Sequence, residues 1–534
     1  MVAFFDIFAY LSVLLRGITL AAEALTVGGV IFQLAIAPRK SLGPLSGLLM
    51  WSAGILAAAQ ACYVAANATV LMASTNLTWA QVATADFCIA GALMIAGAGL
   101  TAWFARTHLA KILCPAGCAL ILAGAVMTSH SVGRLEYRWI LAALTLTHHL
   151  AAAAWIGGLP YLLWSLKHSP DAAAISSRFS RMAILAVGVL VSAGVVMSLI
   201  YVGSTGALTG TTYGIMVLAK AFLTALMVML GALNRNVVQV GIHAVRAGAA
   251  KALLQLRRFT EVEVGIGLTI IMAAASLTSS PPAVDVRADR VSAAEIVLRL
   301  TPRWPRMRGP SPNEFSAVTP NAVSNSVLPA SFVPGQSTTL DSLAEIAWSE
   351  YHHHVAGFMV LAMGILSLLA RRMSWARYWP LSFLGLAVFL ITQADEKNWP
   401  IGPRGFWESL AVPEVPQHAF FVVLIIAFAV FECGAQTSRI RWEGAGLVFP
   451  MVCAVSGTLL LAHSHPLSNV KQEFLVELNH LPIALLSVVA GWARWIEVRL
   501  APEPEGVVLR RFAAWIWPAC FIVIGAILIN YREA

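Results

Sequence analysis

Charged residues are scarce in this chain. Asp, Glu, Lys and Arg together make up 11% of its 534 residues, against about 25% in soluble globular domains. Hydrophobic residues make up 59% of the chain. Because so few polar groups cannot cover a surface that faces water on all sides, this composition excludes an ordinary soluble domain.

Motifs that pair cysteines are also missing. The seven cysteines include no CxxC pair, and most of them lie within apolar runs. We therefore expect no disulfide framework of the kind that holds small secreted domains together. Cys114 and Cys118, one helical turn apart, are interpreted as small core residues. A thiolate metal site at these two positions is the alternative.

The sequence contains no motif for nucleotide hydrolysis. The pattern GxxxxGK[ST] is absent, and no large cytoplasmic domain with a phosphorylatable aspartate is predicted. An ion that crosses the membrane through this protein would therefore move along a gradient or with the help of a partner.

Long apolar runs, by contrast, recur from one end of the chain to the other. Each run of about 18–25 residues is long enough to cross the hydrocarbon layer as a helix. The mean hydropathy is +0.77. We predict an all-α polytopic membrane protein with about 14 transmembrane helices.

Basic residues predict how these helices are oriented. Lys and Arg gather in every second loop, as in residues 235–258 and 371–377, whereas the loops at 75–84 and 204–213 contain none. The positive-inside rule then places both termini in the periplasm of a bacterial inner (cytoplasmic) membrane. The net charge of +9 reflects this topology, and no nucleic-acid partner is expected.

The chain divides into three predicted parts. Residues 1–280 form an eight-helix membrane domain, and residues 341–534 form a six-helix, histidine-rich membrane domain. Residues 281–340, rich in Pro, Ser and Asn, form a periplasmic loop segment between them.

Two histidines lie deep in the predicted fifth span, which covers residues 138–166. His148 and His149 are about ten residues from its start, close to the middle of the bilayer at ~1.5 Å per residue. An ionisable side chain at this depth faces the bundle interior and needs a partner. The functional interpretation is a metal or proton relay. The alternative is a histidine that is hydrogen-bonded within the helix packing.

Three stretches resemble the copper resistance D (CopD) family of bacterial inner-membrane proteins. They are H-H-L-A-A-A-A-W-I-G-G-L at 148–159, R-F-S-R-M-A at 178–183 and T-T-Y-G-I-M-V-L-A-K at 211–220. The resemblance is clearest over about 140–282. The six spans after residue 341 are an additional membrane module, to which the resemblance assigns no function.

Membership of this family implies copper handling across the inner membrane, without enzymatic activity. The usual suggestion is uptake of copper ions from periplasm to cytoplasm, alongside a small periplasmic copper-binding protein. The positions that carry over from the family stretches, besides His148, are Trp155, Gly157, Gly158, Tyr213, Gly214 and Lys220.

The last six predicted spans bring further histidines to the outer side of the membrane. Imidazole binds copper well, and neighbouring carboxylates orient imidazole rings. Glu473, Glu477 and His480 share one helix face by their spacing. The candidate metal ligands on this side are His354, His418, His463, His465, His480 and Glu477.

Two other functions fit the same residues. Haem b needs two histidines on facing helices at equal depth, which His354, His418 and His480 could supply. The protein would then be a membrane electron carrier. Alternatively, the chain is a copper-binding assembly factor that transports nothing.

The alternating basic loops make the topology testable. Reporter fusions at 75–84, 204–213, 281–340 and 397–407 should report the periplasm, and fusions at 240–255 and 436–443 the cytoplasm. Reporter activity on the opposite side at one of these loops would show that a span has been miscounted.

Overall fold

The chain folds into helices. The computed structural model describes residues 2–38, 42–242, 246–310, 343–393, 398–410, 414–462, 470–500 and 507–533, which contain no strand. Helices satisfy all backbone polar groups within one segment, as a chain in lipid requires. By contacts, the chain separates into two compact units, which meet in sequence between Arg290 and Val291.

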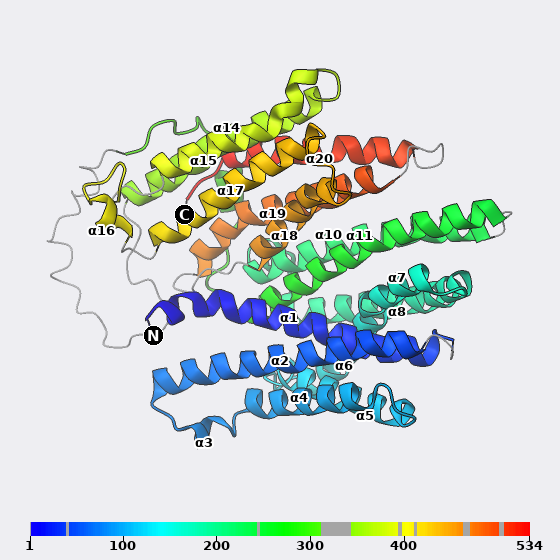
Figure 1. The fold of residues 1–534 in the computed structure, drawn as a ribbon. Coiled ribbons are helices and arrows are strands. Elements are labelled where there is room, and N and C mark those ends of the chain that lie inside the picture. The colour runs from blue at the N-terminus through cyan, green and yellow to red at the C-terminus, as the bar shows by residue number, and fades with distance from the viewer. Residues whose placement is uncertain are drawn as a thin grey trace. The chain divides into compact units, whose positions relative to one another are not determined.

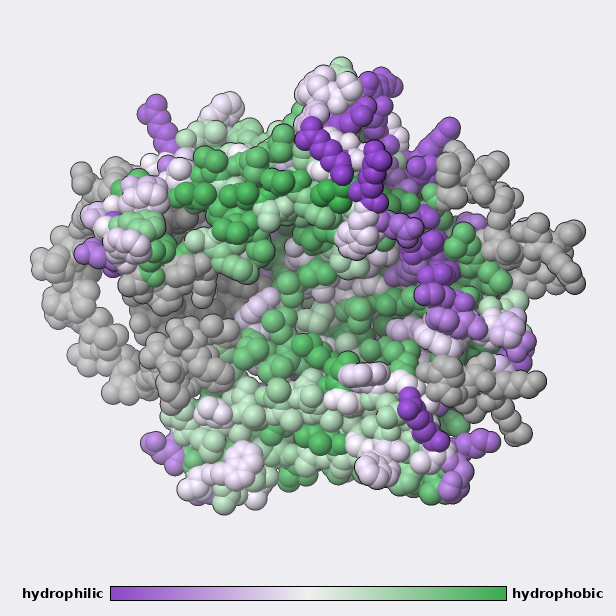
Figure 2. Space-filling model, in the orientation of Figure 1, coloured by the Kyte–Doolittle hydropathy of each residue, from purple (hydrophilic) through white to green (hydrophobic). Residues whose placement is uncertain are grey.

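The number of apolar helices confirms a polytopic membrane protein. Within the described residues, 12 helices are long and apolar enough to cross a membrane. Two shorter apolar helices, Val422–Gln436 and Ala445–Leu461, follow the same pattern. The flanks of the helices are hydrophobic, and hydrophilic side chains gather towards their ends (Figure 2). These helices correspond to the roughly 14 spans predicted from the apolar runs.

The first unit contains the helices up to α11 (Figure 1). Its helices are α1 (Val2–Ala35), α2 (Leu42–Thr75), α3 (Trp79–Val82), α4 (Asp86–Phe104), α5 (Ala110–Met127), α6 (Arg138–Ala152), α7 (Leu159–His168), α8 (Ala172–Val202), α9 (Thr205–Thr209), α10 (Thr212–Ile242) and α11 (Arg246–Ser279). Helix α1 packs against α2, α5, α6, α7 and α11. It is therefore the central helix of this unit.

A π-helical turn interrupts the predicted fifth span. Residues Ala153–Gly157 form this turn, labelled η2, between α6 and α7, and the three elements together make one candidate span, Arg138–His168. Helix α1 also packs against the turn. A Cβ atom on Gly157 would lie 1.9 Å from the carbonyl oxygen of Ala24, and one on Gly28 would lie 2.2 Å from that of Ala153. Glycine at both positions thus lets the two backbones touch.

The second unit contains the remaining helices. They are α12 (Ala293–Leu300), α14 (Leu343–Leu369), α15 (Ser382–Gln393), α16 (Phe406–Leu410), α17 (Glu414–Gln436), α18 (Val448–Leu461), α19 (Val470–Arg499) and α20 (Val507–Ile529), with short 3-10 turns at Ser374–Leu381 and Ala445–Leu447. Helix α20 packs against both α14 and α19, and α15 packs against α17. The contact between α14 and α20 is close, because a Cβ on Gly525 would lie 2.5 Å from the backbone nitrogen of Leu361.

The segment that follows α11 is divided between the two units. Residues up to Arg290 belong with the first unit, and residues 291–310 belong with the second. Helix α12 begins with a capping box, in which Ser292 and Glu295 each bond the backbone of the other. The rest of the predicted loop segment, 311–340, lies outside the described residues.

The contact between α1 and the π-helical turn can be tested with one methyl group. Gly157→Ala should lower the midpoint of thermal unfolding in detergent, because the added Cβ meets helix backbone. Overpacking of this kind costs about 1–3 kcal/mol. Gly188→Ala is the matched control, since a Cβ there meets nothing within 4 Å. Equal stability of the two variants would contradict the close contact.

Candidate metal site

Helix α1 carries a stripe of buried polar side chains. Arg16, Thr19, Glu23 and Thr26 follow one another at three- and four-residue spacing, and each is at most 5% exposed. Such spacing places them on one face of the helix. Glu23 lies in the middle of the candidate span Tyr10–Ala35. The stripe therefore runs through the depth where water is scarcest and a partner is most needed.

Glu23 finds its partner on α6. Its Oε1 lies 2.7 Å from Nδ1 of His149, with the carboxylate 4% and the imidazole 21% exposed. His149 precedes the π-helical turn by one helical turn, so the close glycine contact between α1 and that turn brings the two side chains within reach. Glu23 Oε2 is buried without a hydrogen bond to the described residues. The pair thus presents an unused acceptor inside the bundle.

The geometry of this pair is that of a carboxylate that orients a histidine. When Glu23 accepts the Nδ1 proton of His149, the lone pair of the ring lies on Nε2, which is then available to a metal ion. A carboxylate–histidine pair of this kind raises the basicity of the imidazole ligand. In this tautomer the imidazole of His149 has a form suited to metal binding, near the middle of the span.

His148 faces a different neighbour. Its Nδ1 lies 3.2 Å from the carbonyl oxygen of Leu190 on α8, and its Cε1 lies 3.5 Å from the position of a Cβ on Gly194. Lys220 on α10 adds a positive charge close to this imidazole. The two adjacent histidines therefore point to different helices, and only His149 is paired with a carboxylate among the described residues.

Polar groups continue from the pair in both directions along α1. Towards one end, Arg16 donates to the Thr128 hydroxyl at 3.2 Å, and its guanidinium lies 6.0 Å from the ring of Tyr63. Towards the other end, the hydroxyls of Thr26 and Ser52 lie 3.3 Å apart. Arg16 to Thr26 spans about 15 Å at 1.5 Å per residue.

Several atoms of this region lack protein partners. Arg16 Nη1, Thr19 Oγ1 and both amide atoms of Gln60 on α2 are buried without a hydrogen bond to the described residues. Buried polar atoms are normally satisfied, and exceptions point to water or an ion. The polar stripe therefore has more buried hydrogen-bonding groups than protein partners for them. Its inner end reaches Tyr161, whose hydroxyl lies 3.3 Å from that of Ser52.

Several other positions that the sequence analysis singled out lie in helix contacts or among buried side chains. Trp155, Gly157 and Gly158 belong to the π-helical turn and its end, and Trp155 is buried. Tyr213 packs in an apolar cluster with Leu141 and Tyr201. Cys114 and Cys118 are buried on α5.

His130, which the sequence interpretation passed over, closes one end of this unit. It lies between α5 and α6, and its ring is 6.2 Å from that of Tyr201 and 6.4 Å from that of Tyr213. Burial lowers the pKa of His130. A hydrogen bond to the backbone of Leu277 raises this pKa, and the nearby charges of Arg134 and Arg16 lower it. The imidazole is therefore held neutral above the stripe.

The histidines of the second unit are only partly brought together. His353 stacks on Tyr531 with ring centroids 3.7 Å apart, and its ring is 6.1 Å from that of His480. His354 is bound at both nitrogens: Nδ1 accepts from the backbone N–H of Arg306 at 2.8 Å, and Nε2 donates to the Tyr531 carbonyl at 2.8 Å. His353, rather than His354, is thus the ring neighbour of His480.

Most of the other predicted ligands of the outer cluster have no described side chain. His463 and His465 lie outside the described residues, as does the side chain of His418. Glu477 is buried on α19, one turn before His480. Within the described part of the chain, no three His, Cys, Asp or Glu side chains are grouped to hold a metal ion. The outer cluster remains a prediction.

The helices define a polytopic membrane protein with ionisable side chains paired inside its bundle. The model of the copper resistance protein D (CopD) family matches residues 173–277, which extend from α8 to α11. Two of the three resembling stretches, at 178–183 and 211–220, lie within this match, and the histidine stretch precedes it. The family associates the protein with copper resistance and copper handling. No curated protein and no solved structure matches the chain.

The neutral state of His130 predicts a pH dependence. Since folding lowers its pKa, the unfolded chain binds more protons, and the stabilising contribution is lost as pH falls below about 6.5. The midpoint of thermal unfolding should therefore drop less between pH 7.5 and pH 5 in His130→Gln than in the wild type. His108→Gln, at an exposed histidine of the same unit, should behave like the wild type. An unchanged pH profile in His130→Gln would contradict the argument.

Proposed function

We propose that the first unit moves copper ions across the bacterial inner membrane, from periplasm to cytoplasm, with His149 and Glu23 as the mid-membrane binding position. The observation that carries the proposal is the 2.7 Å contact between these two side chains at the centre of the span. An ionisable pair at this depth is expensive to maintain and marks an ion pathway in membrane proteins. Imidazole is a good copper ligand.

The path of the ion follows the polar stripe of α1. Copper would be bound by Nε2 of His149, while Glu23 holds the ring through Nδ1. The hydroxyls of Thr19 and Thr26 lie about one turn to either side of Glu23 on the same face. In this proposal His148 positions α6 against α8 rather than binding the ion.

The second unit has a supporting role in this proposal. The outer histidines, with His353 and His480 as the described pair, would collect copper at the periplasmic face, together with a small periplasmic copper-binding protein. Imidazole rings 6.1 Å apart come from different helices, as a capture site needs. The haem b alternative is weaker, because His354 has both ring nitrogens engaged with backbone groups.

Substitution of the two adjacent histidines distinguishes a metal site from packing. His149→Ala should abolish the accumulation of copper in cells, measured by elemental analysis. Glu23→Gln should weaken copper binding about 10- to 100-fold, the usual effect of removing a carboxylate behind a histidine ligand. His148→Ala and His168→Ala are controls with the same change, and the latter residue is exposed at the end of α7.

Expression and membrane insertion of each variant must equal those of the wild type. Full copper accumulation in His149→Ala, at normal expression, would rule out this residue as the carrier. Loss in His148→Ala alone would move the site to the face of α6 that meets α8.

A further inference from the structure

The second unit contains a cleft that copper handling does not explain. It encloses about 340 Å³, a size typical of sites for small ligands. Its walls come from the segment after α12, from one face of α14 and from the end of α20. The lining residues are Arg303, Trp304, Arg306, Glu350, His354, Ile529, Asn530, Tyr531 and Arg532.

The walls of the cleft are joined to each other by hydrogen bonds. His354 links the backbone of Arg306 to that of Tyr531, with both bonds at 2.8 Å. Asn530 accepts from the backbone N–H of Arg303 at 3.2 Å and donates to the Leu300 carbonyl at 3.3 Å. These bonds hold the segment after α12 against the chain end beyond α20, so the cleft is formed before any ligand arrives.

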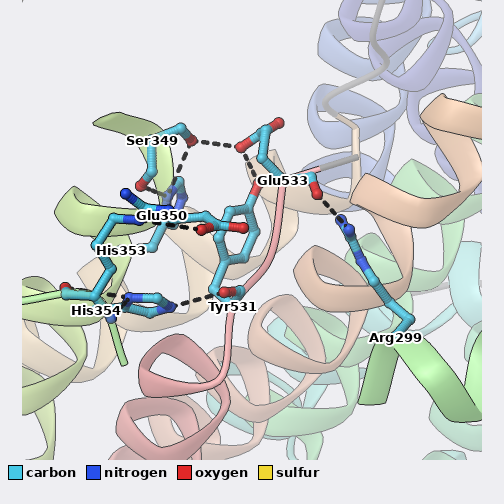
Figure 3. Close-up of polar contacts among 8 residues, drawn as sticks. Arg299, Ser349, Glu350, His353, His354, Tyr531 and Glu533 are labelled. Atoms are coloured by element: carbon cyan, nitrogen blue, oxygen red, sulfur yellow. Dashed lines mark hydrogen bonds and ion pairs between the residues drawn. The ribbon is translucent and has the colours of Figure 1, made fainter. Parts of the chain in front are cut away.

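A buried arginine anchors the same chain end. Arg299 on α12 is 9% exposed, and its guanidinium donates to the carbonyl oxygens of Arg532 and Glu533. Glu533 in turn accepts from the Tyr531 hydroxyl at 2.8 Å. Figure 3 shows Arg299, Tyr531 and Glu533 in this arrangement beside His353 and His354. The chain end that lines the cleft is thus held in place by hydrogen bonds before a ligand binds.

The cleft has a surplus of positive charge. Three arginines line it, against one carboxylate, and that carboxylate, Glu350, lies 3.5 Å from Nε of Arg306. Arg303 and Arg532 carry the other two positive charges of the cleft, and the guanidinium of Arg532 also donates to the carbonyl oxygens of Leu298 and Thr301. Loss of water contact lowers the pKa of Arg532 and the charge of Arg303 lowers it further, whereas the charge of Glu350 raises it. An anion between these guanidinium groups would remove their repulsion.

Trp304 forms an exposed apolar part of the rim of the cleft. It is 94% exposed, and Leu300 and Met307, which are close to it in sequence, are 48% and 52% exposed. The rim adjoins the point where the chain leaves the candidate span Val508–Ile529. Tryptophan is enriched at this level of membrane proteins, where its ring meets both headgroups and acyl chains. Apolar side chains beside an arginine cluster match a ligand with an anionic head and an apolar body.

We propose that this cleft binds a phosphoryl anion, such as the headgroup phosphate of an anionic phospholipid in the adjoining leaflet. Guanidinium groups recognise phosphate through paired, charge-assisted hydrogen bonds. Arg303 binds the phosphoryl oxygens, Arg532 adds positive charge from a guanidinium held by the Leu298 and Thr301 carbonyls, and Trp304 lies against the apolar part of the lipid. The lipid would fasten the segment after α12 to the end of α20 and so stabilise the outer face of this unit.

The test uses the full-length protein and two probes that share the phosphoryl group. The protein is exchanged into phosphatidylcholine micelles that contain increasing amounts of phosphatidylglycerol. Native mass spectrometry then counts the phosphatidylglycerol molecules bound to each protein. Inorganic phosphate is measured separately by equilibrium dialysis. Arg303→Gln should weaken phosphatidylglycerol binding about tenfold, the loss expected for one charge-assisted contact. Arg308→Gln, an equal charge change at an exposed residue that does not line the cleft, should retain wild-type binding.

The two probes identify the source of the anion. Arg303-dependent binding of phosphatidylglycerol supports a lipid site, and Arg303-dependent binding of inorganic phosphate alone supports a site for a soluble phosphoryl anion. The proposal is overturned if neither probe binds, or if Arg308→Gln loses as much binding as Arg303→Gln. Copper accumulation through the first unit is a separate measurement, so failure here leaves the proposed function untouched.

Discussion

A charged side chain inside the hydrocarbon of a membrane must be partnered, and the first unit is organised around that requirement. Glu23 and His149 lie 2.7 Å apart on helices whose backbones touch through glycine. Without the close approach at Gly28 and Gly157, neither side chain would reach the other. The π-helical turn, the glycines and the ion pair are therefore parts of one arrangement, in which helix packing positions the chemistry.

Polar atoms around that pair that lack protein partners support the proposed ion path. A purely structural pair would satisfy both oxygens of the carboxylate, since an unsatisfied buried acceptor costs about 1–3 kcal/mol. Here Glu23 Oε2, Thr19 Oγ1 and the amide of Gln60 make no hydrogen bonds to the described residues. A site with acceptors that make no protein hydrogen bonds is suited to an ion that arrives hydrated and exchanges some of its water for protein oxygens. This favours a path for a cation over a fixed structural contact.

The second unit shows how far the same residue types can differ in role. Its histidines are numerous, yet His354 serves as a hydrogen-bonded bridge between two backbone segments, and His353 stacks on a tyrosine. Its arginines likewise divide: Arg299 is buried against backbone carbonyls, whereas Arg303 faces an open cleft. Residue type predicts which chemistry is possible, and the surroundings decide which one is used.

The sequence alone determined the helical membrane architecture, the approximate number of spans and the CopD resemblance, because apolar runs of membrane-crossing length and local motifs are one-dimensional signals. It also placed His148 and His149 at mid-membrane. Only the tertiary structure showed that His149 meets a carboxylate and His148 a backbone carbonyl, since adjacent residues on a helix point about 100° apart and each meets a different neighbouring helix. The same holds for Glu23, whose partner lies 126 residues away, and for the arginine cleft, whose walls come from segments more than 200 residues apart. Contacts at such separations follow from helix packing, which no local pattern encodes.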